Sequence, residues 1–433
     1  MVEIKKIGIN GEGIGYINKI PVFVDGAFPG ELVEVEIVES HRTYARAKLK
    51  KIIKSSDDRI KGTCLQLKNC DACPMMLLSY DKQLIEKNEL LKESLYKYAG
   101  IRLDHRHKII PSKSAFYFRN SLKLPVREKN KKLVTGMYKQ GSNQFVALDS
   151  CAVHDKKLEE VKKTILSILN QHRVKAYDMK SQSGLRTLVI RGFGREYQCT
   201  FITGKMNFPQ ELLKQLMKVS GLVSIYQGID TRKDTYDLFH EGITLLSGKK
   251  NIELKLLDYK VSLYPQSFFQ LNLTTAESIY RYAVNEITAG QKIVEAYAGI
   301  GGISLCASKK SKHVYGIESI PAAVKNAKDI ARTNNIKNVS YICGDSAKEL
   351  RKILKKEKIH TVVVDPPRSG LSDEMMEVLL SSKVREIIYI SCNLSTLGKN
   401  LKILMKKFKV KRIQGFDMFP HTALVETVVK LGL

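Results

Sequence analysis

One cysteine near the carboxyl end of the sequence has the type and the surroundings that covalent catalysis needs. Cys392 directly follows the apolar run Ile387–Ser391, which predicts a short buried strand. A thiolate at the carboxyl end of such a strand is a strong nucleophile and a good leaving group. We therefore predict that Cys392 reacts with the substrate. For three other cysteines we predict a buried core position: Cys199, Cys306 and Cys343.

Two carboxylates complement this cysteine. Asp365 opens the turn Asp365-Pro366-Pro367-Arg368, whose paired prolines make a rigid acidic tip that suits a flipped-out base. Glu426 can accept a proton at neutral pH. A thiolate that adds to carbon 6 of a uridine lets carbon 5 attack a sulfonium methyl group, and a base must then remove the carbon-5 proton. The three side chains fit methylation of carbon 5 of uridine, in which Cys392 would be the nucleophile and Glu426 the best candidate for the base.

Two other classes of function remain open on these residues alone. An N-methyltransferase acting on an amino group would also use an acidic turn with two prolines, but it would need neither Cys392 nor Glu426. A non-catalytic RNA-binding or assembly factor could keep the fold without the chemistry. The presence of both Cys392 and Glu426 argues against that second alternative.

A glycine-rich turn predicts a nucleoside site beside these groups. Tyr297–Gly302 lies between an apolar run and a helical segment, and its glycines let the backbone approach a ligand closely. Glu318 ends the next apolar run, where a carboxylate can accept both ribose hydroxyl groups, and Asp345 follows the third and could meet the adenine edge. NAD is the competing ligand, but the turn lacks a strict G-x-G-x-x-G, which favours a methyl donor.

Alternating strands and helices must position these turns. From Gln291 onward the pattern predicts an α/β sheet with right-handed crossovers. The expected parallel strands are Ile293–Tyr297, Val314–Ile317, Val339–Cys343, Thr361–Val364 and Ile387–Ser391. Two further strands, Val410–Asp417 and Leu424–Lys430, predict an antiparallel edge. The carboxyl ends of the parallel strands then meet in one crevice, where Asp365 and Cys392 are neighbours.

The net charge points to a polyanionic partner. The 433 residues carry a formal charge of +28, spread along the whole chain. Short strands and glycine turns in Met1–Ile53 predict a small basic β-barrel that binds RNA, with a structural cap as the alternative. Met1–Asn10 lacks a secretory signal, and no stretch is apolar enough for a membrane span. We therefore expect a cytoplasmic protein whose cysteines are reduced.

Three cysteines lie close together in the sequence. Cys64, Cys70 and Cys73 form a C-x5-C-x2-C pattern in a predicted loop, and Cys151 is the only other spare cysteine before the predicted sheet. Clustered thiolates in a reducing compartment suggest a metal site, with unliganded thiols as the alternative.

Together, these motifs resemble the RNA 5-methyluridine methyltransferase family. The matching segments are Ser267–Asn272, Tyr297–Gly302, Asp365–Gly370, Tyr389–Asn393 with Thr396, and Asp417–Thr422 with Glu426. The resemblance implies that S-adenosyl-L-methionine contacts Gln270, Tyr297, Glu318 and Asp365. It also implies Cys392 as nucleophile and Glu426 as proton acceptor. Leu424 departs from the family pattern, which usually has histidine there.

The family's iron–sulfur members resemble this chain in one more respect. Their pattern of three clustered ligands and a distant fourth implies a [4Fe-4S] cluster on Cys64, Cys70, Cys73 and Cys151, with zinc as the alternative. The barrel resembles a TRAM domain. Barrel and cluster together resemble members that act on 23S rRNA, and tRNA is the alternative substrate.

The expected architecture is a multidomain chain of α/β and β parts. Residues 1–55 form a TRAM-like, OB-like barrel that binds RNA, and residues 56–262 form a central α+β domain with the metal-cluster loop. Residues 263–433 form a Rossmann-like class I methyltransferase domain. We expect a monomer that associates with RNA and not with membranes.

Overall fold

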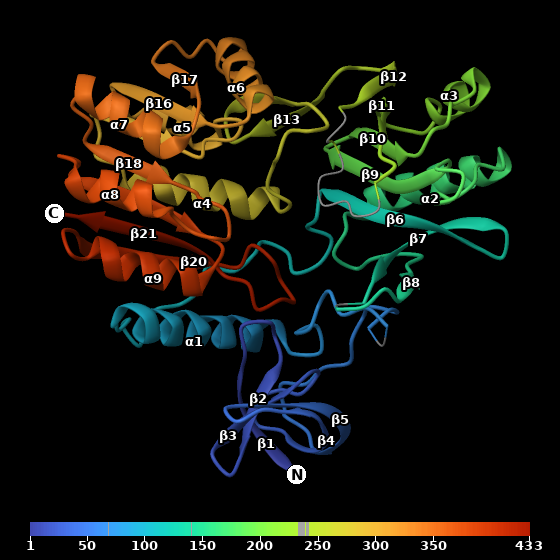
Figure 1. The fold of residues 1–433 in the computed structure, drawn as a ribbon, viewed down its shortest axis with the longest axis horizontal. Coiled ribbons are helices and arrows are strands. Elements are labelled where there is room, and N and C mark those ends of the chain that lie inside the picture. The colour runs from blue at the N-terminus through green and yellow to red at the C-terminus, as the bar shows by residue number, and fades with distance from the viewer. Residues whose placement is uncertain (68, 140, 233–238, 240–241) are drawn as a thin grey trace.

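The computed structural model describes residues 1–67, 69–139, 141–232, 239 and 242–433. In Figure 1 a small barrel lies at the bottom, a mixed sheet with two helices at the right, and a larger helix-covered sheet at the left. The expected combination of a β-barrel with α+β and α/β parts is confirmed. Among the described helices, none is both long and apolar enough to cross a membrane.

Five strands close the N-terminal barrel in the order β1-β2-β3-β5-β4. They are β1 (Val2–Ile7), β2 (Gly13–Ile17), β3 (Ile20–Val24), β4 (Leu32–Ser40) and β5 (Ala45–Lys54). Side chains alternate between the two faces of a strand, so Val22 and Val24 fill the barrel core while Arg46, Lys48 and Lys50 lie outside it. The alternation therefore gives the barrel a basic outer face on β5.

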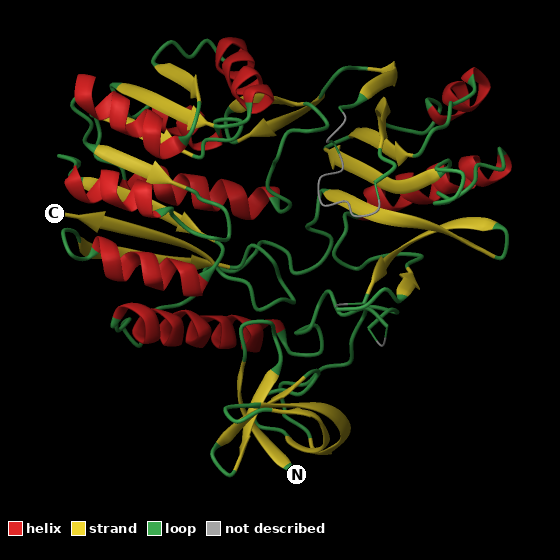
Figure 2. Cartoon of the chain, viewed as in Figure 1, coloured by secondary structure: helices red, strands yellow, loops and turns green. Residues whose placement is uncertain are grey.

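The central part is a seven-stranded sheet in the order β12-β11-β10-β9-β6-β7-β8. Its strands are β6 (Ser121–Lys129), β7 (Lys132–Tyr138), β8 (Phe145–Ala147), β9 (Leu185–Phe193), β10 (Glu196–Thr203), β11 (Leu222–Ile229) and β12 (Thr244–Gly248). Helices α2 (Lys156–Gln171) and α3 (Gln210–Leu216) pack on it and share one hydrophobic core with it (Figure 2). The buried residues Leu158, Val161, Ile165 and Leu169 recur at helical spacing along α2, which explains how it docks.

The C-terminal sheet has the order β17-β16-β15-β18-β19-β21-β20. Its strands are β15 (Lys292–Ala296), β16 (His313–Glu318), β17 (Val339–Cys343), β18 (Thr361–Val364), β19 (Glu386–Ser391), β20 (Lys409–Phe416) and β21 (Glu426–Gly432). The first five pair in parallel, and β21 is antiparallel to both β19 and β20, as predicted. The strand order reverses between β15 and β18, and ligands bind in sheets of this kind at the carboxyl side of that reversal.

Six helices cover the two faces of this sheet. Helices α7 (Ser346–Lys356), α8 (Asp373–Ser381) and α9 (Leu394–Leu404) contribute to the core on one face. Helices α4 (Leu273–Glu286), α5 (Gly302–Ser308) and α6 (Pro321–Thr333) contribute to the core on the other. The strands are buried on both sides, which is why they read in the sequence as continuous apolar runs.

Two elements join the three parts. Helix α1 (Tyr80–Ala99) packs along α9 and also contacts β1 of the barrel (Figure 1). The hairpin of β13 (Ile252–Leu256) and β14 (Tyr259–Leu263) contacts β9 and β10 on one side and α6 on the other. The C-terminal sheet is therefore packed against both the barrel and the central sheet through elements that precede it in the chain.

Candidate active site

The predicted site residues lie along the carboxyl edge of the C-terminal sheet. Four of them end or follow parallel strands: Tyr297, Glu318, Asp365 and Cys392. Glu426 joins them because β21 runs in the opposite direction and begins at this edge. Ser391 pairs with Thr427, so the residue after Ser391 and the residue before Thr427 are neighbours. This register brings Cys392 and Glu426 together at the end of β19.

The turn after β15 exposes its backbone on one side. Tyr297, Gly299 and Gly301 have φ of 64°, 54° and 79°, in the left-handed region. A Cβ on Gly301 would lie 2.1 Å from the Tyr341 hydroxyl oxygen, so only glycine fits there. Nothing lies within 4 Å of the corresponding point on Gly299. Tyr297 holds a strained conformation without being glycine, and such strain is typical of functional turns.

Glu318 closes this turn from the neighbouring strand. Its Oε2 accepts a hydrogen bond from the backbone N–H of Gly299 (2.9 Å), and its Oε1 accepts one from the backbone N–H of Ile320 (2.9 Å). The carboxylate is only partly buried, so it retains lone pairs for ribose hydroxyl groups. Asp345 instead caps α7 by accepting from the N–H groups of Ala347 and Lys348, which already occupies its Oδ1.

The loop that carries Gln270 is hydrogen-bonded to two other parts of the molecule. Asn120 donates to the Gln270 carbonyl oxygen (3.0 Å), and Arg191 of β9 donates to the Ser267 carbonyl oxygen (2.7 Å). Asn272 caps α4 and also donates to the Met418 carbonyl oxygen (3.2 Å). The backbone of Gln270 is therefore fixed by the central sheet and by the segment that leads to Glu426, while its side chain stays half-buried.

The turns that hold Asp365 and Cys392 are bonded to each other. Asn393 and Thr396, on the Cys392 side, both donate to the carbonyl oxygen of Arg368 on the Asp365 side (3.0 and 3.2 Å). Asn393 is also the N-cap of α9, so Cys392 directly precedes a helix N-terminus, which favours a thiolate. These contacts hold the thiol and the acidic turn at a fixed separation.

Two buried carboxyl groups, Asp365 and Glu426, lie near the Cys392 thiol. Burial and the Asp365 carboxylate raise the pKa of Glu426, and burial raises the pKa of Asp365. Burial, followed by the charges of Glu426 and Asp365, raises the pKa of Cys392, and the Arg368 guanidinium opposes that shift. Without a ligand, the site therefore favours protonated groups over a cluster of like charges.

Side chains of helix α1 contact the loop that precedes Glu426, through its residues Asp417 and His421. Lys87 and Asp417 form an ion pair of 2.5 Å, and both side chains are fully buried. Tyr80 donates to the second Asp417 oxygen (2.8 Å). Gln83 accepts a hydrogen bond from the His421 backbone N–H (2.9 Å) and meets its Nδ1 (3.2 Å). Removing one partner of a buried pair is costly, so this contact fixes the loop strongly.

His421 is a support and not a second base for the reaction. Its side chain is 2% exposed, and the ring lies against Phe116 with 4.6 Å between centroids. Burial lowers the pKa of His421 to about 4, so the ring is neutral at physiological pH. The Met75 backbone N–H donates to its carbonyl oxygen (3.0 Å), which bonds this loop to the segment after Cys73.

Three supporting residues escaped the sequence reasoning. Lys87 is distant in sequence from Asp417, and Arg368 stood in the recognised turn without an assigned role. Glu295 on β15 is buried, which raises its pKa to about 8, and it accepts hydrogen bonds from the backbone N–H (2.8 Å) and the hydroxyl of Ser304. The sequence does hold one indication that Glu295 has a role, because a carboxylate inside a buried apolar strand needs hydrogen-bond partners.

The four cysteines of the predicted metal site come into mutual range. All four are partly buried. Burial, and then the nearby thiols of Cys151, Cys70 and Cys64, raise the pKa of Cys73 to about 12. Arg119 lies within electrostatic range of Cys73 and Cys151. In the described part of the chain, however, no group of three or more His, Cys, Asp or Glu residues is arranged to hold a metal ion.

The three cysteines predicted to be in the core behave differently from one another. Cys199 is fully buried, as predicted, whereas Cys306 in α5 is only partly buried and packs against the core. The prediction for Cys343 was wrong, because its side chain is exposed. Cys343 is the last residue of β17, which lies at the edge of the sheet, so no further strand covers it.

Comparison with protein families gives two matches. Residues 79–432 match the tRNA (Uracil-5-)-methyltransferase family, and residues 1–50 match the TRAM domain. An uncharacterized RNA methyltransferase from Bacillus cereus is 36% identical over 99% of this chain and 96% of its own length. An uncharacterized RNA methyltransferase from Streptococcus agalactiae is 33% identical over 99% of this chain and 97% of its own.

A solved structure is similar along the whole chain. It is the tRNA (uracil-54, C5)-methyltransferase of Pyrococcus abyssi in complex with S-adenosyl-L-homocysteine. The TM-score is 0.80 at 26% identity, and the match covers 100% of both chains. The similarity therefore extends over the barrel, the central sheet and the C-terminal sheet.

The raised pKa of Glu426 makes a prediction for stability. The pKa of Glu426 is raised from 4.5 in the unfolded chain to about 8 in the folded protein. Between these two pH values the folded protein binds the proton more tightly, so its free energy of unfolding falls as pH rises, by about 1.4 kcal/mol per pH unit. Glu426→Gln should therefore be more stable than wild type in urea unfolding at pH 8, and equally stable at pH 4.5. Glu34→Gln, which changes an exposed carboxylate of the barrel, should match wild type at both pH values. A Glu426→Gln protein no more stable than wild type at pH 8 would contradict the assigned shift.

Proposed function

Because this chain belongs to the RNA uracil-5-methyltransferase family, whose members use S-adenosyl-L-methionine, we propose that it methylates uridine through a covalent bond to Cys392. The register of β19 and β21 carries the proposal, since it sets Cys392 beside Glu426. Asp365 directly follows the adjacent strand β18, and its charge contributes to the raised pKa of Cys392. An enzyme that methylated an amino group would have no use for this pairing of a thiol with a base.

The proposed reaction has four steps. The Cys392 thiol loses its proton to solvent, and the thiolate adds to carbon 6 of the uracil, which moves an electron pair onto the oxygen at carbon 4. Carbon 5 then attacks the methyl group of S-adenosyl-L-methionine and releases S-adenosyl-L-homocysteine. Glu426 takes the proton from carbon 5, the bond between carbons 5 and 6 becomes double again, and the thiolate leaves. The raised pKa of Glu426 suits this last proton transfer, because a base works best with a pKa near the operating pH.

We assign the methyl donor to Gln270, Tyr297, Glu318 and Asp365. Glu318 and the Gly299 backbone stand together at the mouth of the strand reversal, where an adenosine ribose would lie. Asp365 borders both this side and the Cys392 side, so it would also touch the target base. Arg368 would offset part of the negative charge beside Cys392.

The proposed substrate is 23S rRNA. The support is the resemblance to iron–sulfur members that act on it, together with the convergence of four thiols near Arg119. tRNA is a second candidate, because the structure that is similar over the whole chain is a tRNA (uracil-54, C5)-methyltransferase.

The three parts of the chain would divide the work. Residues 1–55 would supply RNA affinity through the basic face of β5, residues 56–262 would form the central domain, and residues 263–433 would form the catalytic domain. We propose a monomer.

We further propose that Cys64, Cys70, Cys73 and Cys151 hold a [4Fe-4S] cluster. Four partly buried thiols within electrostatic range of one another provide a donor set of the right type and number for such a cluster. Such a group would bind the loop around Cys73 to that around Cys151. The backbone N–H of Met75, two residues after Cys73, donates a hydrogen bond to the His421 carbonyl oxygen. The cluster would therefore have a structural role, because it would support the loop before Glu426.

The covalent step predicts a trapped complex. RNA that carries 5-fluorouridine has no removable proton at carbon 5, so the wild-type enzyme with S-adenosyl-L-methionine should form a methylated adduct that survives denaturing gel electrophoresis. Cys392→Ser should form none, and Cys199→Ser, which changes a buried cysteine elsewhere, should form it normally. Glu426→Gln should accumulate the adduct even on ordinary uridine, since base removal typically slows turnover about 10²–10⁴-fold. An active wild-type enzyme without any adduct would overturn the mechanism.

The metal proposal predicts iron and sulfide in protein purified without oxygen. About four of each per chain are expected for one [4Fe-4S] cluster, with broad absorption near about 400 nm. Cys64→Ser should lower both contents, whereas Cys199→Ser should leave them unchanged. If the purified protein contains one zinc ion per chain and no sulfide, the four cysteines bind zinc and not an iron–sulfur cluster.

The substrate proposal predicts a missing modification in cells that lack this protein. Mass spectrometry of nucleosides and fragments from both RNA classes should show 5-methyluridine lost from 23S rRNA and retained in tRNA. Complementation with Cys392→Ser should not restore it, while complementation with wild type should. Loss from tRNA alone would assign the enzyme to the second candidate.

A further inference from the structure

Two hollows lie at the edge of the C-terminal sheet opposite the candidate active site. One, of about 480 Å³, lies at the starts of β19 and β20 and the end of β21. The other, of about 1210 Å³, lies at the starts of β15 and β16 and at the carboxyl ends of α7 and α8. They share the lining residues His360 and Arg385, so they adjoin each other, and we call the two hollows together the amino-edge groove.

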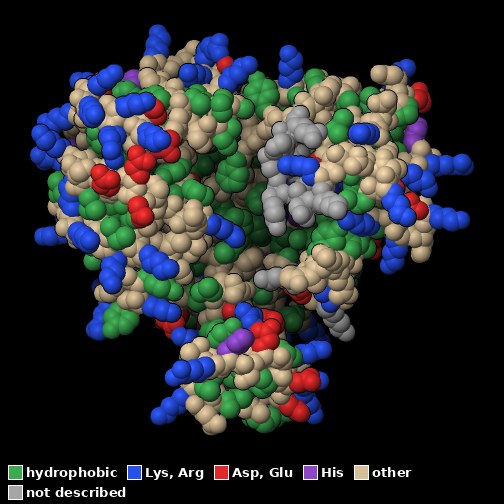
Figure 3. All heavy atoms as spheres, in the orientation of Figure 1, with side chains coloured by type: hydrophobic (Ala, Val, Ile, Leu, Met, Phe, Trp, Pro, Cys, Tyr) green, Lys and Arg blue, Asp and Glu red, His purple; other side chains and the backbone are tan. Residues whose placement is uncertain are grey.

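The lining of the amino-edge groove is strongly basic. Eleven Lys and Arg side chains line it against four Glu. In Figure 3, Lys and Arg side chains crowd the left-hand outline of the molecule, over the part that holds α7 and α8 in Figure 1. The groove therefore carries a disproportionate share of the excess positive charge of the chain.

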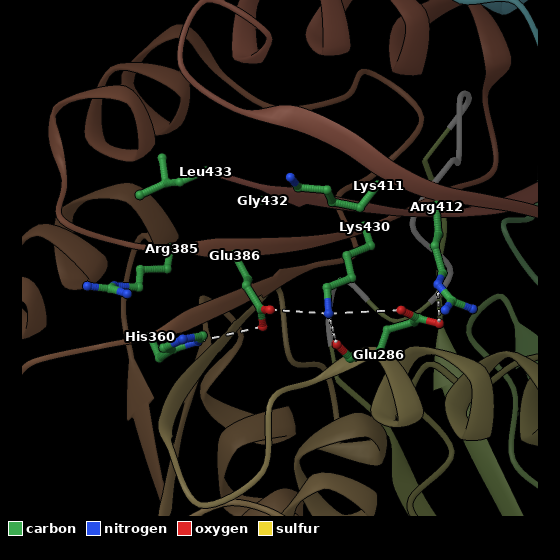
Figure 4. A pocket seen from close by; sticks show the side chains of 9 residues that line it. All are labelled: Glu286, His360, Arg385, Glu386, Lys411, Arg412, Lys430, Gly432 and Leu433. Atoms are coloured by element: carbon green, nitrogen blue, oxygen red, sulfur yellow. Dashed lines mark hydrogen bonds and ion pairs between the residues drawn. The ribbon is translucent and has the colours of Figure 1, made fainter.

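The glutamates pair with four of the eleven cations: Lys292, Arg351, Arg412 and Lys430. Figure 4 shows Lys430 between Glu386 and Glu286, at 3.2 and 3.9 Å, with Arg412 also directed at Glu286. Arg385 and Lys411 extend from the same pocket without a drawn partner. Within the described residues, six cations of the larger hollow have no ion pair: Lys312, Lys355, Lys356, Lys358, Lys383 and Arg385.

Placing so many unpaired cations together costs free energy unless an anion offsets their repulsion. Apart from His360, no aromatic side chain is among the described residues that line the groove, so bases have no surface to stack on. A row of exposed lysines without stacking residues fits a phosphate backbone and not a base-specific site.

The groove is too far from the candidate active site to contact the same nucleotides. The five peptide steps from His360 to Asp365 along β18 span about 16 Å at the usual rise of a strand. An RNA that reaches both edges must therefore pass around the sheet. We infer that the amino-edge groove binds the phosphate backbone of the substrate RNA at a distance from the target uridine, so that only a large folded RNA gains from it.

Three lysines allow a clean test, because Lys312, Lys358 and Lys383 are exposed and lie in connections outside the helices and strands. The triple variant K312Q/K358Q/K383Q should weaken binding to a long RNA by about tenfold or more at 0.1 M salt and lower the magnitude of the salt slope by about 2–3. Binding and methylation of a hairpin too short to pass around the sheet should be unchanged. The matched control K325Q/K328Q/K337Q removes the same charge from exposed positions on and after α6, outside the groove.

Three results would overturn the inference. They are an unchanged affinity for the long RNA, an equal loss in the control variant, and an equal loss on the short hairpin. Each would show that the groove lysines act, if at all, through overall charge or through the active-site face. A wild-type enzyme that methylated neither RNA would instead refute the proposed function, so the two failures are distinguishable.

Discussion

The site depends above all on the register between β19 and β21. Pairing of Ser391 with Thr427 is what sets a thiol from one strand end beside a carboxyl group from the next strand's beginning. A shift of one residue would turn Glu426 to the other face of the sheet. The register is well specified because both faces of these strands are buried, with Tyr389, Val428 and Val429 packed in the two cores. Hydrophobic packing thus fixes the geometry on which the proposed chemistry rests.

The loops above this sheet are held from outside it. Asp417 is anchored on Lys87 and Tyr80 of α1, and the Gln270 loop is anchored on the central sheet through Asn120 and Arg191. Neither anchor lies in the C-terminal sheet, so the preceding parts of the chain are required for the site to be rigid. Buried, charged and directional contacts of this kind hold a catalytic loop more tightly than apolar contact alone.

The C-terminal sheet could be predicted from the sequence because buried parallel strands give continuous apolar runs and their ends carry recognisable turns. Helices α4 and α9 were not among the expected elements, although Asn272 and Asn393 at their starts are readable caps and the buried residues of both helices recur at helical spacing. Cys343 was misplaced because an apolar run does not reveal that its strand lies at a sheet edge. The Lys87–Asp417 pair joins residues far apart in the chain, and no local pattern encodes it.

The charges of the site also suggest why its groups stay uncharged before a ligand binds. Burial raises the pKa values of Asp365, Glu426 and Cys392. The Asp365 charge adds to the shift of Glu426, and the charges of both carboxylates add to the shift of Cys392. The methyl donor of this family carries a positive sulfonium, and a positive charge set among these groups favours their ionised forms. RNA phosphates would act in the opposite direction, but solvent and ions screen charges outside the buried crevice over roughly 10 Å. The proposed nucleophile would then become a thiolate chiefly when the methyl donor is present, so that addition to the uracil without a methyl group to transfer is disfavoured.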